Sequence, residues 1–400
     1  MKYIVILGDG MSDEPIEKIG NKTPLEAAVT PVMDELATRS EIGLLHTIPE
    51  GMSPGSDTAN LAVLGYDPKK YYSGRSPLEA LSIGVPMEET DVAFRCNIVT
   101  LSEDEELYED KKILDHSSDE ISTEDAAVLL EAVRAELENE DYRFYVGTSY
   151  RHCTIWKNGQ VIPLTPPHDH LGEVAGPYLP EDETLRKMQK RSYEILSVHP
   201  INVERKAKGL NPANSLWFWG AGTRPMLSSF EELYGKKGVM ISAVDLLKGI
   251  AVGAGMRNII VPGANGGLNT NYEGKAQAAV DALLKEGADF AYIHLEAPDE
   301  MGHQGSLERK IKAIENLDSR VIRIVKEQMD ASGEPYRMLI LPDHPTPLRI
   351  RTHSSAPVPY MLYDSTKTIN SDLLYNEKCA GASGIYREHG HEMMGYLLSE

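Results

Sequence analysis

Three short apolar runs along the chain are each followed closely by aspartate or histidine. Runs of this length that are rich in β-branched and aromatic residues predict buried strands. In open parallel α/β sheets, functional sites form beyond the carboxyl ends of the strands. The pattern therefore predicts an α/β protein with a mostly parallel sheet between helices and with metal-type ligands gathered at one edge. The runs and the residues behind them are Tyr3–Leu7 before Asp9, Phe290–Leu295 before Asp299 and His303, and Met338–Leu341 before Asp343 and His344.

Other segments show the period of amphipathic helices. One face of the segment 24–39 is apolar, and Pro31 would either kink this helix or split it in two. The segment Leu307–Val325 has the clearest 3.6-residue period. A further helix is expected over Asp57–Leu64, behind a glycine-containing loop. Ser56 would then lie at a helix N-terminus, where backbone N–H groups and the helix dipole favour a bound phosphoryl group.

The segment from about 89 to 209 has a different character, with strand-like stretches and capped helices. We interpret 89–209 as an inserted α+β cap domain, and 1–88 with 210–400 as the α/β core domain. Two chain crossings between these domains would form a hinge that gates substrate access. Within the insert we expect strands at Asp91–Leu101 and in Tyr142–Trp156, helices at Ser122–Leu137 and Asp182–Leu196, and a hairpin turn at Asn158-Gly159.

The later part of the core returns to an alternation of strands and helices. There we expect strands at Leu216–Trp219, Val239–Ser242 and Asn258–Val261, and a helix at Asp245–Val252.

Composition narrows the class of protein. The chain has 400 residues, enough for two domains, and a formal net charge of −21. This charge argues against a general binder of nucleic acid or of anionic membranes, but permits a small anionic substrate beside metal ions. No stretch reaches the ~18 apolar residues of a membrane span, and the start shows no signal-peptide layout. The three scattered cysteines suit a reducing cytoplasm. The oligomeric state is left open.

The aspartates and histidines behind the predicted strands could form two metal sites. Asp299 and His303 are four residues apart, so at the head of a helix both side chains would lie on one face. An Asp-His pair after a strand, taken alone, is more typical of a turn or a helix cap; the joint occurrence at several strand ends favours metal binding. Mixed oxygen and nitrogen ligands suit Mn, Zn, Co or Fe better than Mg or Ca. The two possible sets are Asp299, His303 and His353, and Asp9, Asp343 and His344 with Ser56 bridging toward the second set.

Several motifs resemble the metal-dependent branch of the alkaline phosphatase superfamily and, more narrowly, the cofactor-independent phosphoglycerate mutases of archaeal type. The resemblance implies that Ser56 becomes transiently phosphorylated. It also implies two divalent ions, one bound by Asp299, His303 and His353 and the other by Asp9, Ser56, Asp343 and His344. We expect manganese first, and zinc, cobalt or magnesium as alternatives. The motifs are Ile6-Leu7-Gly8-Asp9-Gly10, Lys22-Thr23-Pro24-Leu25-Glu26-Ala27-Ala28, Pro54-Gly55-Ser56-Asp57-Thr58-Ala59-Asn60, Leu64-Gly65-Tyr66-Asp67-Pro68, Glu296-Ala297-Pro298-Asp299-Glu300-Met301-Gly302-His303 and Pro342-Asp343-His344.

The same resemblance suggests which residues contact the substrate. Arginine grips carboxylates and phosphates in a bidentate manner, although a single arginine is more commonly a surface charge. Arg95 and Arg151 are favoured, because both lie in strand-like segments of the insert. The full set of candidates is Arg95, Arg151, His152, Lys248, His168, Asp169 and Arg224.

Two reactions are compatible with these motifs. The first is the interconversion of 3- and 2-phosphoglycerate through a phosphoserine. The second is a homoserine kinase-like phosphotransfer, because a bacterial branch with that proposed activity resembles this chain at Pro54–Asn60 and Phe94–Asn97. A kinase would have to use Ser56 and the metals, since there is no Walker-type loop, and its pocket would need an unpaired acid such as Asp169. A non-catalytic protein on the same fold would bind no metal.

Overall fold

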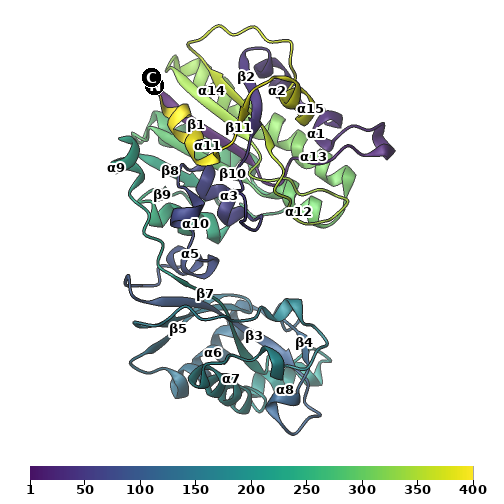
Figure 1. Cartoon of the computed structure of the whole chain (residues 1–400), viewed down its shortest axis with the longest axis vertical. Coiled ribbons are helices and arrows are strands. Elements are labelled where there is room, and N and C mark those ends of the chain that lie inside the picture. The colour runs from purple at the N-terminus through teal and green to yellow at the C-terminus, as the bar shows by residue number, and fades with distance from the viewer. Residues whose placement is uncertain (400) are drawn as a thin grey trace. The chain divides into compact units, whose positions relative to one another are not determined.

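The computed structural model describes residues 1–399, which form two compact units (Figure 1). The core unit comprises residues 1–72 and 227–399, and the insert unit comprises Ser73–Met226. The insert predicted from the sequence, 89–209, is narrower. The difference arises because α5 (Arg75–Ser82) and β7 (Ser215–Thr223) pack against β3 (Val92–Leu101) of the insert. The segment Leu216–Trp219, expected as a core strand, is therefore part of the insert sheet.

The core unit is built on an eight-stranded sheet. Every pairing in it is parallel except the two made by β12, so the expected mostly parallel α/β sheet is confirmed. The last edge strand is shorter than the expected Asn258–Val261, and Ile260 is exposed. The order is β13 (Tyr386–Arg387), β2 (Ser40–Leu45), β12 (Val358–Asp364), β11 (Tyr336–Leu341), β1 (Lys2–Gly8), β10 (Phe290–Leu295), β8 (Gly238–Ile241) and β9 (Arg257–Asn258).

Helices lie on both faces of this sheet. One face of β1, with Ile4 and Ile6, packs against α2 (Pro31–Ala37), α11 (Tyr272–Leu284), α13 (Leu307–Leu317) and α14 (Arg323–Ser332) (Figure 1). On the other face, α10 (Asp245–Gly253) contacts β8, and α16 (Met393–Leu398) contacts β11. The remaining core helices are α1 (Pro24–Ala27), α3 (Ser56–Val63), α4 (Pro68–Tyr71), α9 (Phe230–Tyr234), α12 (Ala297–His303) and α15 (Glu377–Ala382).

Two predicted helices of the core are interrupted. Pro31 splits the segment 24–39 into α1 and α2, and each of the two helices begins at a proline, the position where a missing N–H costs nothing. The long periodic segment contains a π-helical turn at Asp318–Ile322 between α13 and α14. The carboxylate of Asp318 accepts hydrogen bonds from the first-turn N–H groups of α2, including that of Met33 at 2.7 Å. The helix break therefore places a side chain that caps a neighbouring helix.

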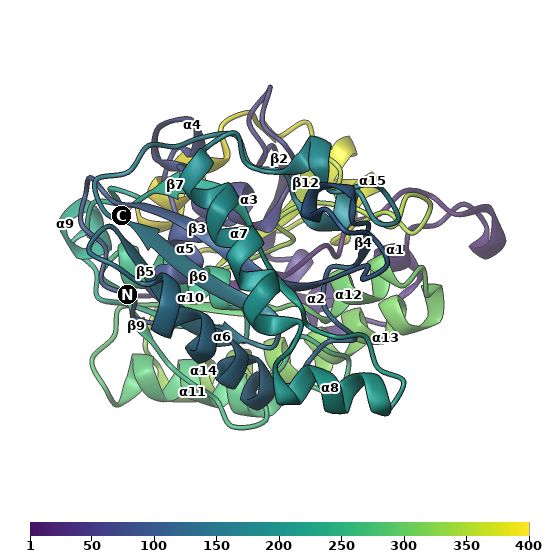
Figure 2. The same ribbon diagram turned by 90° about the horizontal axis from the view of Figure 1, so that it is seen from below.

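The insert unit is a five-stranded antiparallel sheet with its two longest helices packed on one face and α5 on the other. The sheet order is β4 (Ile113–Asp115), β3, β6 (Arg151–Trp156) and β5 (Tyr142–Thr148), and β7 also pairs with β3. Figures 1 and 2 show α6 (Thr123–Leu137) and α7 (Glu183–Leu196) beside this sheet, with α8 (Pro200–Ala207) following α7. Ser122 caps α6, and Asp182 caps α7, within the two helices that the sequence predicted. Asn158 forms a turn with φ +48°, but no strand follows it; the hairpin instead turns between β5 and β6, so that expectation was wrong.

Among residues 1–399, no helix combines the length and the apolar character that a transmembrane span requires.

A buried lysine ties together two loops that leave the sheet at the same edge. The ammonium of Lys310 on α13 is fully buried and donates to Asp13 Oδ2 at 2.8 Å and to the carbonyl of Thr346 at 2.8 Å. Asp13 lies in the loop after β1, and Thr346 lies in the loop after β11. Because these partners are buried with it, the ion pair determines the relative positions of the two loops.

We expect Lys310→Ala to destabilise the core unit by about 3–5 kcal/mol, because it leaves the buried carboxylate of Asp13 without its cationic partner. Urea unfolding monitored by fluorescence would measure the change. Lys312→Ala is the matched control on the same helix, because the Lys312 side chain is 60% exposed and reaches Glu315 only at 3.9 Å. Equal and small effects of the two substitutions would show that Lys310 does not determine the loop positions.

Candidate metal centre

The three strands that the sequence analysis singled out are neighbours at the middle of the core sheet. β1 lies between β10 and β11, and all three run in the same direction. Leu7 of β1 is in register with both His294 of β10 and Leu341 of β11, so the strands end almost level. The residues that follow each strand are therefore delivered to one edge of the sheet, as expected for an α/β site.

One ligand group consists of Asp9, Asp343 and His344, whose candidate ligand atoms all lie within 4.8 Å of one another. Nε2 of His344 is 3.5 Å from Asp9 Oδ1 and 3.5 Å from Asp343 Oδ2. The same nitrogen lies 3.1 Å from the hydroxyl oxygen of Ser56, the first residue of α3. The hydroxyl that the sequence marked as a nucleophile is thus beside this group.

A second ligand group surrounds Asp299 on α12. His303, one turn further along α12, places Nε2 at 3.1 Å from Asp299 Oδ2, and His353 places Nε2 at 3.5 Å from Asp299 Oδ1. The two histidine Nε2 atoms are 3.1 Å apart. His344 joins this group as well, since its ligand atom lies within 4.8 Å of those of Asp299 and His353. The two groups therefore share His344.

Glycine is required in the turn that carries Asp9. Gly10 has φ +58°, a left-handed conformation that side chains other than glycine rarely adopt. A Cβ at this position would lie 2.5 Å from Asp299 Oδ1, and the Gly10 N–H donates to Asp343 Oδ1 at 3.1 Å. The backbone itself therefore approaches both acidic ligands.

The charges of this centre are unbalanced without a cation. Burial raises the pKa of the Asp9 carboxyl well above its ordinary value, and the charges of Asp343 and Asp299 add to this effect. Asp9 Oδ1 is buried and has no hydrogen-bond partner. A divalent cation would satisfy that oxygen and offset the repulsion among the carboxylates, so the residues present fit a metal ion.

Histidine chemistry links metal binding to pH in the Asp299 group. A hydrogen bond to Asp299 raises the pKa of His303 to about 9. A histidine must be in its neutral form to bind a metal, so binding through His303 Nε2 would release a proton.

Four buried polar residues beside the ligands were missed by the sequence analysis. Asn60 on α3 and Tyr292 and His294 on β10 are fully buried, and the Thr346 hydroxyl donates to Asp299 Oδ1. Burial lowers the pKa of His294 to about 3, so its imidazole is neutral at pH 7. The available signal was a histidine inside the otherwise apolar run Phe290–Leu295, which ordinary burial does not explain.

The candidate substrate residues, except Lys248, lie in the insert unit. Arg95 is held by the carboxylate of Glu79, with Nε–Oε2 at 2.6 Å, and its guanidinium lies 4.7 Å from the centre of the Trp219 ring. Arg151 is exposed and lies 5.2 Å from the Tyr150 ring centre. In the antiparallel pairing, Arg95 faces Cys153 and Asn97 faces Arg151, so Arg95 and Arg151 project from the same face of the sheet.

The other candidates differ in their surroundings. His152 projects from the opposite face, is buried, and accepts a hydrogen bond from Gly147 N–H at 3.1 Å; burial lowers its pKa to about 4. His168 Nε2 lies 3.6 Å from Asp169 Oδ1. Arg224 donates to the Met87 carbonyl at 3.1 Å, and Lys248 of the core unit pairs with Asp245 at 3.1 Å.

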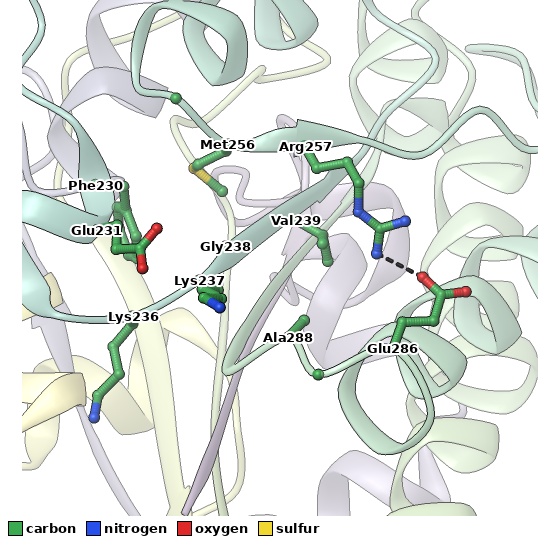
Figure 3. Close-up of a pocket in the computed structure, with 12 residues that line it drawn as sticks. Phe230, Glu231, Lys236, Lys237, Gly238, Val239, Met256, Arg257, Glu286 and Ala288 are labelled. Carbon is green, nitrogen blue, oxygen red and sulfur yellow. Dashed lines mark hydrogen bonds and ion pairs between the residues drawn. The ribbon is translucent and has the colours of Figure 1, made fainter.

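A separate pocket of about 220 Å³ (Figure 3) opens at the amino-terminal end of β8. The ligands lie at the opposite, carboxyl ends of the strands. The lining of the pocket includes Lys236, Lys237 and Arg257. Arg257 already pairs with Glu286 at 2.5 Å, as the dashed line in Figure 3 shows. The pocket lies at the end of the strands opposite to that where α/β sheets place their sites, and no group of metal ligands lines it.

Comparisons with known proteins identify the relatives of this chain. The 2,3-bisphosphoglycerate-independent phosphoglycerate mutase family matches at residues 37–202. A protein of that name from Methanosarcina barkeri is 48% identical, over 100% of this chain and 99% of its own length. Another from Methanosarcina acetivorans is 50% identical, over 91% of this chain and 90% of its own.

Two solved structures share the fold. A protein from Pyrococcus horikoshii superposes with a TM-score of 0.82 at 29% identity, covering 100% of this chain and 98% of that one. The cofactor-independent phosphoglycerate mutase from Thermoplasma acidophilum gives a TM-score of 0.66 at 27% identity, covering 100% and 99%. Together with the sequence relatives, these similarities define the chain as an α/β enzyme of the isomerase class. It belongs to the 2,3-bisphosphoglycerate-independent phosphoglycerate mutase family, which confirms the resemblance seen in its motifs.

We expect Asp9→Asn to stabilise the metal-free protein at pH 7 by at least about 1 kcal/mol, a rise in Tm of roughly 2–4 °C. The pKa of the Asp9 carboxyl is higher in the folded state than in the unfolded state, so the folded protein holds this proton more tightly. As the pH rises above the unfolded pKa of about 3.9, loss of the proton therefore favours the unfolded state and destabilises the protein. The advantage of the Asp9→Asn variant should therefore vanish near pH 4.

Thermal unfolding in EDTA, and then with added Mn²⁺, would test this expectation. Mn²⁺ should raise the Tm of the parent protein more than that of the Asp9→Asn variant. A variant that is less stable than its parent at pH 7 without metal would contradict the assigned repulsion.

Proposed function

We propose that this chain interconverts 3-phosphoglycerate and 2-phosphoglycerate through a phosphoserine at Ser56. The observation that carries the proposal is the position of the Ser56 hydroxyl, 3.1 Å from Nε2 of His344, the residue common to both ligand groups. The names of the relatives favour phosphoglycerate as the substrate, a small phosphorylated acid.

The ligand groups would hold two divalent ions, with manganese as the first choice because the ligands mix carboxylate oxygen with imidazole nitrogen. Asp299, His303 and His353 would hold one ion, and Asp9, Asp343 and His344 with Ser56 would hold the other. Bound there, the ions supply positive charge that lowers the pKa of the serine hydroxyl and neutralises the phosphoryl oxygens.

The reaction then has two balanced halves. The Ser56 hydroxyl gives up its proton as Oγ forms a bond to phosphorus, while the bond from phosphorus to the 3-oxygen of the substrate breaks and that oxygen takes up a proton. The glycerate stays bound, and its 2-hydroxyl then loses a proton as its oxygen bonds to phosphorus, while the bond from phosphorus to Ser56 Oγ breaks and Oγ takes up a proton. Water must be excluded during the interval, because it would hydrolyse the phosphoserine.

We assign recognition of the substrate anion to cationic side chains of the insert unit and to Lys248. Arg151 is the stronger arginine candidate, because its exposed side chain has no carboxylate partner among the described residues, whereas Arg95 is already neutralised by Glu79. His168 and Arg224 remain candidates for the same role. His152, which burial keeps neutral, and Asp169, a carboxylate, remain candidates for contacts to the hydroxyl groups of the substrate.

The homoserine kinase alternative is not favoured by a specific observation. Asp169, the acid expected to hold an ammonium group, is largely exposed and lies near His168.

We propose a cytoplasmic location for the protein. The three free cysteines support it, since thiols such as that of Cys96 persist in reducing compartments.

We expect Ser56→Ala to abolish mutase activity with Mn²⁺ and 3-phosphoglycerate while the Tm stays within a few degrees, because only the attacking oxygen is lost. Ser53→Ala is the matched control, since Ser53 is an exposed serine that precedes Ser56 by three residues. Mass spectrometry of quenched parent protein should find one phosphoryl group on Ser56. Retained activity in Ser56→Ala would exclude the serine as nucleophile, and product formed only from ATP and homoserine would replace the proposed reaction.

We expect Arg151→Ala to raise KM for phosphoglycerate by about tenfold or more, because a charge-assisted hydrogen bond to a substrate anion is lost. The metal content should not change. Arg191→Ala serves as the control, since Arg191 is an exposed arginine of the same unit that pairs with Glu136. Steady-state kinetics with elemental analysis would measure both quantities, and an unchanged KM would remove Arg151 from the substrate contacts.

A further inference from the structure

Strand β10 presents two polar side chains to the metal centre from inside the sheet. Tyr292 and His294 are two residues apart, so they project from the same face of the strand, and both are fully buried. Neither belongs to the two ligand groups. His294 is instead hydrogen-bonded directly to the carboxylate of Asp9, and Tyr292 is linked to the carboxylate of Asp343 through Asn60.

Tyr292 acts through Asn60. Its hydroxyl donates to Asn60 Oδ1 at 2.6 Å, which fixes the orientation of the amide. The amide nitrogen of Asn60 then donates to Asp343 Oδ2 at 2.8 Å and to the carbonyl of Ser56 at 2.8 Å. One side chain thus connects the acidic ligand Asp343 to the first turn of the helix that carries the nucleophile.

His294 acts on Asp9. Its Nδ1 lies 3.2 Å from the hydroxyl of Ser242, and that hydroxyl accepts a hydrogen bond from Val244 N–H at 3.0 Å. An ionised Asp9, the form that binds a cation, can only accept, so the imidazole proton then lies on Nε2 and is donated to Asp9 Oδ2 at 2.9 Å, while Nδ1 accepts from the Ser242 hydroxyl. This arrangement occupies one oxygen of Asp9 and leaves the other, the buried and unpartnered Oδ1, to face the centre.

We propose that Tyr292 and His294 are positioning residues that preset the carboxylates of Asp343 and Asp9 for a single divalent cation. The inference rests on the proposed function, because it assumes that this group binds a metal. Both hydrogen-bond chains are buried, so they cannot be replaced by water when a donor is removed. Outer hydrogen bonds of this kind typically change metal affinity by about 10–100-fold.

The test is a calorimetric titration of metal-free protein with Mn²⁺. Tyr292→Phe and His294→Leu should each weaken one of the two binding events by about tenfold or more and leave the other unchanged. His294→Gln should recover much of the affinity, because its amide can donate to Asp9 from a position close to Nε2. Tyr292→Phe removes a single oxygen atom, so it keeps the test decisive if His294→Leu does not fold.

Tyr336→Phe is the matched control. Tyr336 lies on the neighbouring strand β11, is buried, and donates to Asp330 at 2.8 Å with no connection to the metal ligands. Its substitution should lower the Tm to a similar degree as Tyr292→Phe without changing Mn²⁺ affinity.

The outcomes separate this inference from the proposed function. Parent protein that binds no Mn²⁺ would overturn the proposed function. Parent protein that binds two ions and turns over phosphoglycerate, with Tyr292→Phe and His294→Leu binding both ions equally well, would overturn the inference alone. Equal loss of affinity in Tyr336→Phe, or equal weakening of both binding events, would also overturn it, since either result would indicate a general loss of structure.

Discussion

The mutual repulsion of three buried carboxylates is the constraint on which the rest of the centre depends. Asp9, Asp299 and Asp343 lie at one edge of the core sheet, and burial together with the charges of Asp343 and Asp299 raises the pKa of Asp9. Neutral hydrogen-bond donors hold Asp9 and Asp343 in place, and in the metal-free protein a protonated His303 pairs with Asp299. Lys310 offsets charge at Asp13, further along the loop. Such an arrangement costs stability in the free protein and is retained where it serves a function.

The strand order explains why so few residues are needed to build the centre. Because β1 lies between β10 and β11, three consecutive strands of the sheet end at the same level, and each needs only a short turn to present a ligand. Asp299 lies in the first turn of α12, which follows β10, and Ser56 is the first residue of α3, which follows a loop. The ligands are far apart in the chain but adjacent in the sheet.

The sequence predicted the parts of the centre that follow strand ends, but little of what lies inside the elements. Asp343 and His344 interrupt an apolar run, so their position is visible in the pattern. Tyr292 and Asn60 occupy buried positions where the pattern indicates only core packing. The pairing of Arg95 with Glu79 and the addition of β7 to the insert sheet depend on contacts between distant segments, which periodicity does not reveal.

The reversed direction of β12 has a consequence for how this centre can evolve. Because β12 runs against β11, the connection between them stays at one edge of the sheet, and it carries both His344 and His353. Their imidazole rings lie 4.0 Å apart between centres. An insertion or deletion in this single loop would displace a histidine from each ligand group, so both groups are expected to be inherited or lost together among descendants of this fold.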